Sequence, residues 1–315
     1  MSASDLRIKP GVYVPIPIFF HDNEDLDFAA LENHIAYLAN TGLAGIVVQG
    51  STGEAVHLTD EERIQVVRQA KAYIAKHDPS LTLIAGTGAG SVRNTLQLTK
   101  EAAAAGAEYA MILPPCYYRG SMDDEAMLSF FLGVADESPI PIIIYNYPGV
   151  TQGIDISPAV IGELAKHKNI AGIKGTDGNI GKVADLAVKT KGTGFTLLAG
   201  STDFTLAAMT VGARGCIVGL GNALPRACVK LHNLFEQGNV QEAVKLQHQL
   251  VEPDNALCRW FGLPGVKAGL DHITQNGGPL RRPLRPLNAD QRVKIAQAFA
   301  DGLAIEKSLQ ISENK

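Results

Sequence analysis

The sequence predicts an α/β fold, a (β/α)8 TIM barrel followed by a helical C-terminal extension. Three observations support this prediction. Short apolar runs rich in β-branched residues alternate with helical stretches from residue 11 to about residue 237. The runs are apolar on both faces and the loops between them are short, as expected of a parallel sheet covered by helices. Beyond residue 238 the strand signal stops and the chain becomes helical.

The eight apolar runs are expected to be the strands of one sheet. They lie at 12–19, 44–49, 82–85, 107–113, 141–145, 170–174, 195–199 and 215–218. Eight strand–helix units favour a closed barrel. A doubly wound open sheet stays an alternative, because hydrophobic periodicity does not show whether a sheet closes.

Each strand is followed by a helix, and several helices have a recognisable start. Thr59 is a good N-cap with Glu61 and Glu62 in the first turn after it, and Ser157-Pro158 combines an N-cap with proline at the first helical position. Other barrel helices are expected from about residues 27, 91, 123, 179, 202 and 225, and further helices at 240–251, 254–273 and 289–304. Since no linker-like segment interrupts the chain, we expect one domain over residues 1–315, with the barrel at 11–237 and the C-terminal helices at 238–315.

Composition and charge exclude several classes of partner. Hydrophobic residues make up 46% of the 315 residues and charged residues 19%, which is typical of a globular protein with a sizeable core. The net charge of −4 provides no basic field for nucleic acid or an anionic membrane. Apolar stretches reach only strand length, so no membrane span is expected.

The four cysteines and the N-terminus indicate the compartment. Cys116, Cys216, Cys228 and Cys258 are widely spaced without a CxxC pair, which argues against a disulfide framework and a structural zinc site. Residues 1–10 contain neither an apolar core nor an Arg/Ser-rich amphipathic stretch. The sequence therefore predicts a cytoplasmic protein.

Unusual polar residues gather where the predicted strands end. In a TIM barrel the chemistry lies at the C-terminal ends of the strands. Polar or glycine-rich segments follow most of the strands there, at 49–54, 114–118, 145–148, 174–176, 200–203 and 219–222, whereas the opposite strand ends are followed by ordinary turns. This asymmetry indicates a functional site at one end of the barrel.

Lys174 closes the sixth apolar run and is the main candidate nucleophile. A lysine is costly to bury as a cation, so burial would hold it as a neutral amine. A neutral amine in a dry pocket attacks carbonyl carbon and starts Schiff-base chemistry. The alternative is an ordinary strand-end lysine whose amine extends to water.

Two neighbouring strand ends could complete such a site. The glycines in Gly50-Ser51-Thr52-Gly53 would let backbone N–H groups converge on a carboxylate, although most such segments are only turns. Tyr145 ends an otherwise apolar strand. Its phenol could relay protons if a hydroxyl such as that of Ser51 lies within reach, and otherwise it would be a core tyrosine.

Taken together, these segments resemble a known family. Gly-Ser-Thr-Gly-Glu at 50–54, Tyr-Asn-Tyr-Pro at 145–148 and Gly-Ile-Lys-Gly-Thr at 172–176 have the order and spacing of the dihydrodipicolinate synthase/N-acetylneuraminate lyase family of pyruvate-dependent class I aldolases. The resemblance extends from Gly11 to about Leu287.

The resemblance implies a role for each site residue. It implies that Lys174 forms an imine with pyruvate or another 2-oxo acid, with no cofactor beyond that covalent bond. Tyr145 would be the proton-relay phenol and Ser51 would pass the proton on. Thr52 and the loop amides of Gly50 and Gly53 would hold the carboxylate.

The resemblance also implies self-association. Tyr117, in Pro-Cys-Tyr-Tyr-Arg, matches a tyrosine that members of the family insert into the site of a neighbouring subunit. The minimal active unit would then be a homodimer, commonly within a homotetramer. Ile217 matches a position whose backbone carbonyl lines the imine pocket.

One departure from the family pattern concerns the second substrate. Val150 stands where dihydrodipicolinate synthases carry an arginine that binds the carboxylate of aspartate semialdehyde, which argues against that activity. The segments 115–120, 246–248 and 261–267 resemble the branch of 4-hydroxy-2-oxoglutarate aldolases and fungal 2-keto-3-deoxy sugar-acid aldolases. Thr52, Thr176 and Asn222 are neutral hydrogen-bonding candidates.

These residues favour a lyase that cleaves a sugar acid such as L-threo-3-deoxy-hexulosonate. A 4-hydroxy-2-oxoglutarate aldolase is the alternative, and dihydrodipicolinate synthase or a non-catalytic sugar-acid-binding barrel are further ones. The non-catalytic barrel is disfavoured because a binding module needs no buried amine.

A glycine-rich segment, three histidines and Asp203 are weighed as further candidate features. The glycine-rich segment 86–90 follows the third strand with GxGxG spacing, which differs from a dinucleotide-binding loop. His21, His34 and His57 are interpreted as surface or capping residues, and no metal site is expected. Asp203 either helps to orient a substrate or is an acid at a helix N-terminus.

Overall fold

The computed structural model, which describes residues 7–313, shows a closed barrel of eight parallel strands in chain order. The first strand pairs with the last, with Tyr13 opposite Ile217, so the open-sheet alternative is excluded and the predicted fold class is confirmed. The strands are β1 (Gly11–Pro15), β2 (Gly45–Val48), β3 (Thr82–Gly86), β4 (Tyr109–Ile112), β5 (Ile142–Asn146), β6 (Ile170–Gly175), β7 (Thr196–Ala199) and β8 (Gly215–Ile217).

The first strand is shorter than expected. It ends at Pro15 rather than at residue 19. The N–H of Ile16 still donates to the carbonyl of Val47, but Pro17 lacks the N–H that a strand ladder requires, so the apolar run continues outside the strand. The other strands agree with the expected positions to within two residues at each end.

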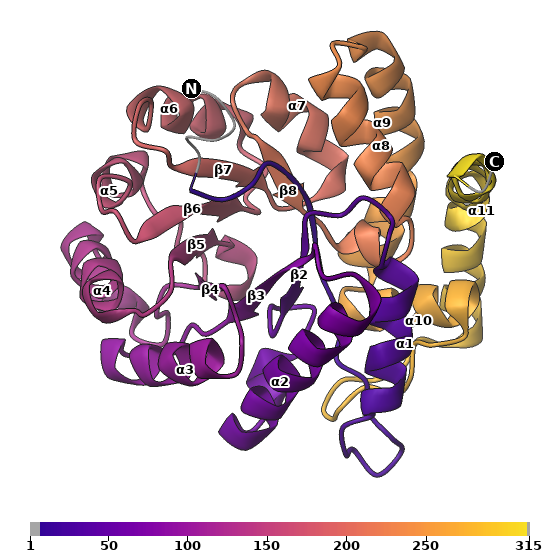
Figure 1. The fold of residues 1–315 in the computed structure, drawn as a ribbon, viewed down its shortest axis with the longest axis horizontal. Coiled ribbons are helices and arrows are strands. Elements are labelled where there is room, and N and C mark those ends of the chain that lie inside the picture. Colours follow the sequence, from indigo (N-terminus) through magenta and orange to yellow (C-terminus); the bar gives the residue numbers. More distant parts are fainter. Residues whose placement is uncertain (1–6, 314–315) are drawn as a thin grey trace.

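Helices surround the barrel, and the expected N-caps start several of them (Figure 1). Asp27, Thr59, Ser91, Asp123, Ser157 and Asn179 each accept a backbone N–H, and Thr59 forms a reciprocal capping box with Glu62. The barrel helices are α1 (Phe28–Leu38), α2 (Asp60–His77), α3 (Val92–Ala104), α4 (Asp124–Glu137), α5 (Pro158–Leu164), α6 (Ile180–Lys189), α7 (Thr205–Thr210) and α8 (Pro225–Glu236).

The C-terminal extension differs from the prediction in one place. Helix α9 (Val240–Asp254) continues into a π-helix, Asn255–Trp260, and the next helix, α10 (Leu263–Thr274), begins only after a break. The sequence had been expected to form one helix over 254–273. Gly262 ends the helical run because it takes a positive φ of 58°, a conformation that favours glycine. The last helix, α11 (Ala289–Glu313), is longer than expected.

The extension packs against one side of the barrel. Helices α9 and α11 contact α8, and α10 packs against α11 and the π-helix, so that the whole extension lies on one side of the barrel in Figure 1. The buried carboxylate of Glu306 on α11 accepts the backbone N–H groups of Arg226 and Ala227 at the start of α8. This contact joins the last helix to the barrel. The domain bounds that were expected include residues 1–6 and 314–315, which lie outside the described residues.

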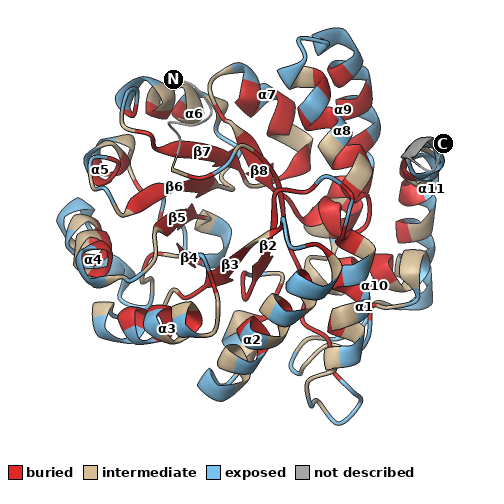
Figure 2. Ribbon diagram, viewed as in Figure 1, coloured by how far each residue is buried: buried red, intermediate tan, exposed pale blue. Residues whose placement is uncertain are grey.

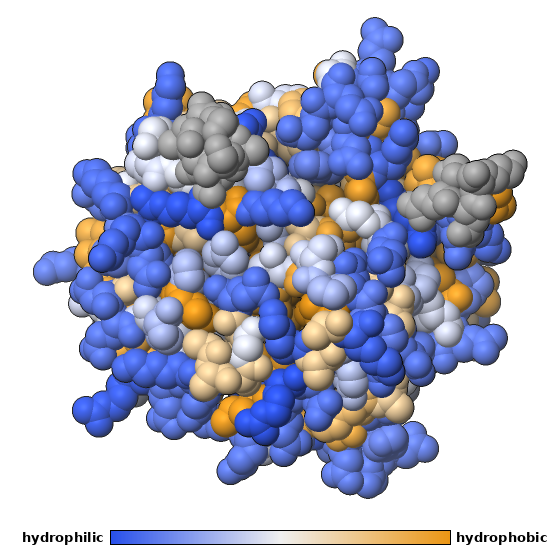
Figure 3. All heavy atoms as spheres, in the orientation of Figure 1, coloured by the Kyte–Doolittle hydropathy of each residue, from blue (hydrophilic) through white to orange (hydrophobic). Residues whose placement is uncertain are grey.

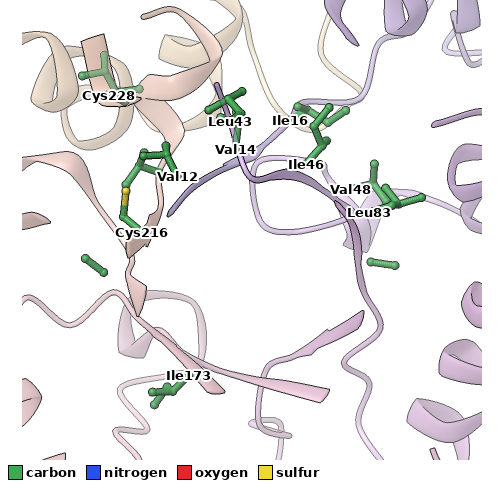
Figure 4. Close-up of a cluster of buried hydrophobic side chains, with 14 of the residues drawn as sticks. Val12, Val14, Ile16, Leu43, Ile46, Val48, Leu83, Ile173, Cys216 and Cys228 are labelled. Carbon is green, nitrogen blue, oxygen red and sulfur yellow. The ribbon is translucent and has the colours of Figure 1, made fainter. Parts of the chain in front are cut away.

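Strand residues alternate between two apolar layers. Val12 and Val14 on β1 belong to the layer between strands and helices, whereas Tyr13 belongs to a cluster inside the barrel. Figure 4 shows labelled members of the outer layer pointing away from the centre of the barrel. In Figure 2 the strands are buried and exposure is confined largely to the outer surfaces of the helices.

The chain preceding β1 closes the N-terminal end of the barrel. Arg7 donates to the carbonyl oxygens of His167 and Ile170, and Ile8 is buried with the inner cluster. This segment crosses the barrel in Figure 1, and Figure 3 shows that the surface around it is mostly hydrophilic. Among the described residues, this covering leaves the opposite end of the barrel, where the strands have their C-termini, as the open one.

Several expectations about single residues can be compared with the structure. His34 is buried in the apolar face of α1, not at the surface, and its Nε2 lies 2.9 Å from Oδ1 of Asn222. All four cysteines are free thiols. Between residues 7 and 313, no helix is long and apolar enough to cross a membrane. Over the same range, no group of three or more His, Cys, Asp or Glu side chains could hold a metal ion.

Candidate active site

Lys174 lies on β6 at the C-terminal end of the barrel. It stands opposite Tyr145 on β5 and Leu198 on β7, and only 4% of the residue is exposed. Its Nζ lies 4.2 Å from the centroid of the Tyr145 ring, and it forms no ion pair with any described residue. Burial lowers the pKa of this amine from 10.5 to about 7, because the cation loses its hydration. Lys174 is therefore partly neutral near pH 7.

Tyr145 lies next to the Lys174 amine. It is almost fully buried, and its Oη lies 3.5 Å from Oγ of Ser51. Burial raises the pKa of this phenol to about 12, and the hydrogen bond to the Ser51 hydroxyl opposes that shift. The ring stacks on Tyr147 with centroids 5.9 Å apart. The phenol stays protonated near neutral pH and has the Ser51 hydroxyl as a partner for proton exchange.

The Gly50–Gly53 segment is a tight turn after β2. The N–H of Gly53 donates to the carbonyl of Gly50 over 3.1 Å. A Cβ at Gly53 would lie 2.7 Å from the backbone nitrogen of Gln49, so the turn leaves no room for a side chain there. Ser51 and Thr52 both line the cavity that contains Lys174. Gly50 instead lines an adjacent cavity, and Gly53 belongs to the lining of neither.

A buried ion pair connects this turn to the C-terminal extension. The Glu54 side chain is fully buried; its Oε1 lies 3.1 Å from Nζ of Lys267 on α10, and its Oε2 lies 2.8 Å from Nδ1 of His57. Nζ of Lys267 also donates to the carbonyl of Pro279 and lies 4.8 Å from the centroid of the Phe20 ring. Burial lowers the pKa of Lys267, and Glu54 opposes that shift. No local sequence pattern indicated this contact.

The cavity above Lys174 has a volume of about 340 Å³ and receives residues from several loops and from the extension. Among the residues that line it are Ser51, Thr52, Tyr145, Tyr147, Val150, Lys174, Thr176, Cys258 and Arg259. A second cavity of similar volume adjoins it and shares Ser51, Tyr145 and Val150. These three residues therefore face both cavities.

Thr176 is brought into the cavity as expected of a substrate-binding candidate. Its Oγ1 is buried and has no hydrogen-bond partner among residues 7–313. A Cβ at Gly200 would lie 2.0 Å from that oxygen, so glycine at position 200 is what makes room for the hydroxyl. The free hydroxyl is available to a bound molecule.

Three other candidates lie outside the cavity lining. Asn222 is fully buried; its amide donates to the carbonyls of Pro15 and Gly219, and its Oδ1 contacts His34. These bonds hold the end of β8 and leave the amide unavailable to a ligand. Ile217 is buried inside the barrel, and Gly219 lines the cavity from this strand end. Tyr117 is 80% exposed and packs edge-on against Tyr118.

Among the cavity residues that sequence reasoning did not assign to the site are Cys258 and Arg259. Both belong to the π-helix, which the helical periodicity of this region did not indicate. Nη2 of Arg259 forms an ion pair of 2.6 Å with Oδ2 of Asp203. Asp203 therefore has a partner inside the site, beyond its place at the start of a helix.

The buried carboxylate of Asp254 holds the backbone beside the Arg259–Asp203 ion pair. Oδ2 of Asp254 accepts the hydroxyl of Ser201 over 2.7 Å and the backbone N–H of Asp203 over 3.1 Å. Burial raises the pKa of Asp254 to about 6, while the hydrogen bond from Ser201 lowers it. The β7 loop and the extension are thus joined directly beside the cavity.

This geometry combines an amine that is partly neutral near pH 7, a phenol beside the Ser51 hydroxyl and the free hydroxyl of Thr176 in a partly enclosed space. A buried amine can add to a carbonyl carbon, and the phenol can exchange protons with the adduct. The arrangement is suited to Schiff-base chemistry on a small oxo acid.

Comparison with known proteins agrees with this interpretation. The sequence profile of the dihydrodipicolinate synthetase family matches residues 9–301. The chain is 42% identical to a protein of Emericella nidulans named "Probable 4-hydroxy-2-oxoglutarate aldolase, mitochondrial", covering 96% of this chain and 98% of the relative. It is 41% identical to the L-threo-3-deoxy-hexylosonate aldolase of Hypocrea jecorina, covering 95% and 98%.

A solved structure shows the same architecture. The dihydrodipicolinate synthase of Acinetobacter baumannii complexed with pyruvate has a TM-score of 0.85 at 28% identity, covering 93% of this chain and 98% of that protein. The resemblance inferred from the three sequence motifs is therefore confirmed. The chain belongs to the dihydrodipicolinate synthetase family.

Proposed function

We propose that this chain, a pyruvate-dependent aldolase (a lyase) of its family, cleaves a 4-hydroxy-2-oxo acid to pyruvate and an aldehyde through an imine at Lys174. The observation that carries the proposal is the buried Lys174 amine, which lies against the ring of Tyr145 without an ionic partner among the described residues. A charged lysine could not attack a carbonyl, so the lowered pKa is what makes the residue a nucleophile.

The cleavage can be written as a sequence of balanced steps. The Lys174 amine adds to C2 of the substrate, and the carbonyl oxygen leaves as water to give the iminium. Loss of the proton from the C4 hydroxyl breaks the C3–C4 bond. The electron pair moves into an enamine and the aldehyde departs. The proton returns to C3, and water then hydrolyses the imine to release pyruvate.

Tyr145 and the Gly50–Gly53 turn are proposed to support these steps. The phenol of Tyr145 relays the proton between the C4 hydroxyl and C3, and the hydroxyl of Ser51 extends the relay. Thr52 and the amides of the turn hold the substrate carboxylate, and Thr176 supplies a further hydroxyl. We keep the Ile217 carbonyl as a predicted member of the imine pocket.

For the second half of the substrate we propose a hydroxylated fragment, as in L-threo-3-deoxy-hexulosonate. Val150 lines the cavity and cannot bind a carboxylate. The charge of Arg259, the other basic residue of the lining besides Lys174, is balanced by Asp203. The second candidate is 4-hydroxy-2-oxoglutarate, because relatives of nearly equal identity carry the names of both aldolases.

The assembly is proposed to be a homodimer or a tetramer built from such dimers. Tyr117 and Tyr118 are strongly exposed apolar side chains on one loop. The second cavity opens beside Ser51 and Tyr145 and could receive a tyrosine from another subunit. The cytoplasmic location stays a prediction, since one of the relatives compared above is named as mitochondrial.

Trapping with borohydride tests the imine. With pyruvate present, reduction should add one pyruvate-derived group to Lys174, detectable by intact-mass and peptide mass spectrometry. Lys174→Met should give no adduct, whereas Lys245→Met, at an exposed lysine, should react as the unmodified chain does. Tyr145→Phe should keep the adduct but lower turnover by about 10²-fold or more. An adduct on another lysine would disprove the proposed role of Lys174.

The pH dependence of imine formation follows from the lowered pKa of Lys174. Only the neutral amine reacts, and the folded-state pKa is about 7 instead of 10.5. The rate should therefore rise about tenfold per pH unit below pH 7 and level off above it. Quenched-flow trapping with pyruvate measures this rate. A rate that still climbs steeply between pH 8 and pH 10 would contradict the proposed neutral amine.

A comparison of two substrates tests the proposed aldehyde fragment. Pyruvate release from L-threo-3-deoxy-hexulosonate should have a kcat/KM about tenfold or more above that from 4-hydroxy-2-oxoglutarate, because the cavity offers no uncompensated cation. A lactate dehydrogenase-coupled assay measures both. The opposite preference would establish the second candidate instead.

Mixed dimers test the role of Tyr117. Tyr117→Ala and Lys174→Met chains should each be nearly inactive alone. After subunit exchange in equal amounts, activity should return to about a quarter of the original value, because half of the dimers are mixed and each has one complete site. No recovery after demonstrated exchange would mean that Tyr117 does not act in the partner's site.

A further inference from the structure

We propose that Arg259 is a specificity-determining residue that contacts the aldehyde half of the substrate, and that Asp203 positions it and cancels its charge. This inference rests on the proposed cleavage at Lys174 and concerns only which aldehyde fragment the site accepts. Together Arg259 and Asp203 would favour a fragment that carries hydroxyl groups over one that carries a second carboxylate.

Arg259 has access to the cavity from the side of the extension. It lines the same space as Lys174, Tyr147 and Thr176, and its side chain is 54% exposed. The guanidinium has N–H donors on three nitrogens, and the ion pair with Asp203 involves Nη2. Donors therefore remain for oxygen atoms of a bound substrate.

The π-helix determines where Arg259 lies. A π-helical turn is wider than an α-helical one, and such turns recur at functional sites. Here the residue before Arg259, Cys258, packs so closely on the end of β8 that a Cβ at Gly219 would lie 2.6 Å from its Sγ. This contact holds the turn against the barrel and presents both Cys258 and Arg259 to the cavity.

Asp203 is itself held in place on the β7 loop. Its backbone N–H donates to Asp254, which is fully buried and also accepts the Ser201 hydroxyl. The Asp203 carboxylate is mostly buried, at 17% exposure, and its Oδ2 contacts Arg259 at 2.6 Å. The guanidinium is thus oriented by a carboxylate that does not line the cavity.

The ion pair between Arg259 and Asp203 is expected to discriminate between substrates whose aldehyde half carries hydroxyl groups and those whose aldehyde half carries a carboxylate. Guanidinium N–H groups can donate to hydroxyl oxygens while the ion pair stays intact. A second substrate carboxylate would have to approach a guanidinium that already has an anionic partner, and the two carboxylates would repel each other. Apart from Arg259, the basic residue in this lining is Lys174, whose nitrogen is bound to the substrate as the imine during cleavage.

The test measures specificity and imine formation separately in three variants. Arg259→Leu removes the donors, Asp203→Asn frees the charge of the guanidinium, and Arg292→Leu is the control. Arg292 is also half-exposed and forms an ion pair of 3.0 Å with Asp271, away from the cavity. For each variant, kcat/KM for pyruvate release is measured with L-threo-3-deoxy-hexulosonate and with 4-hydroxy-2-oxoglutarate, and pyruvate is trapped on Lys174 with borohydride.

Each variant has a distinct expected result. Arg259→Leu should lower kcat/KM for the sugar acid about tenfold or more, while the rate of pyruvate trapping changes less than about twofold. Asp203→Asn should raise the ratio of activity on 4-hydroxy-2-oxoglutarate to activity on the sugar acid about tenfold, because the freed cation attracts the second carboxylate. Arg292→Leu should change neither quantity.

The outcomes distinguish this inference from the proposed function. If the unmodified chain traps no pyruvate, the proposed cleavage at Lys174 fails. If it traps pyruvate and cleaves both substrates, but the ratio stays within about twofold in Arg259→Leu and Asp203→Asn, the specificity role is disproved. A parallel loss of pyruvate trapping and cleavage in Arg259→Leu would also overturn it, since Arg259 would then act on the pyruvate half.

Discussion

The burial of the Lys174 amine explains most of what surrounds it. A lysine at the end of β6 is stable in its place only if its surroundings accept a neutral amine, because a buried cation without a partner is costly. The Tyr145 ring against Nζ, the apolar cluster inside the barrel and the closed N-terminal end keep water from that side. The same enclosure raises the pKa of Tyr145, so that one environment shifts the pKa values of both the proposed nucleophile and the proposed proton carrier.

The C-terminal extension completes this enclosure. Lys267 on α10 neutralises Glu54 directly after the Gly50–Gly53 turn, and Asp254 holds the backbone next to Asp203 on the β7 loop. A buried ion pair contributes little net stability, but removing one partner leaves an unpaired buried charge. These contacts therefore hold the loops in one arrangement. The extension is therefore part of the site, because it lines the cavity and holds two of the loops that surround it.

The fold could be predicted from the sequence wherever an element depends on residues that are close together in the chain. Alternating apolar runs located all eight strands, and caps such as Thr59 and Ser157 located helix starts, because each depends on residues only a few positions apart. The early end of β1 follows from the same rules applied more strictly, since Pro17 cannot donate to a ladder. The π-helix was not predictable in this way, because its apolar residues fit the period of an ordinary helix.

Eight strand–helix units, the family resemblance and the candidate residues Lys174, Tyr145 and the Gly50–Gly53 turn could all be inferred from the sequence, whereas closure of the sheet was seen only in the pairing of β1 with β8. The inferences from sequence were possible because strand periodicity and short motifs are properties of neighbouring residues. The folded structure was needed to show that Asn222 and His34 bond to each other inside the molecule and that the Thr176 hydroxyl has no hydrogen-bond partner among the described residues. It alone brought Arg259 to Asp203 beside the cavity. Such contacts join residues far apart in the chain, and they exist only once the barrel has closed and the extension has packed against it.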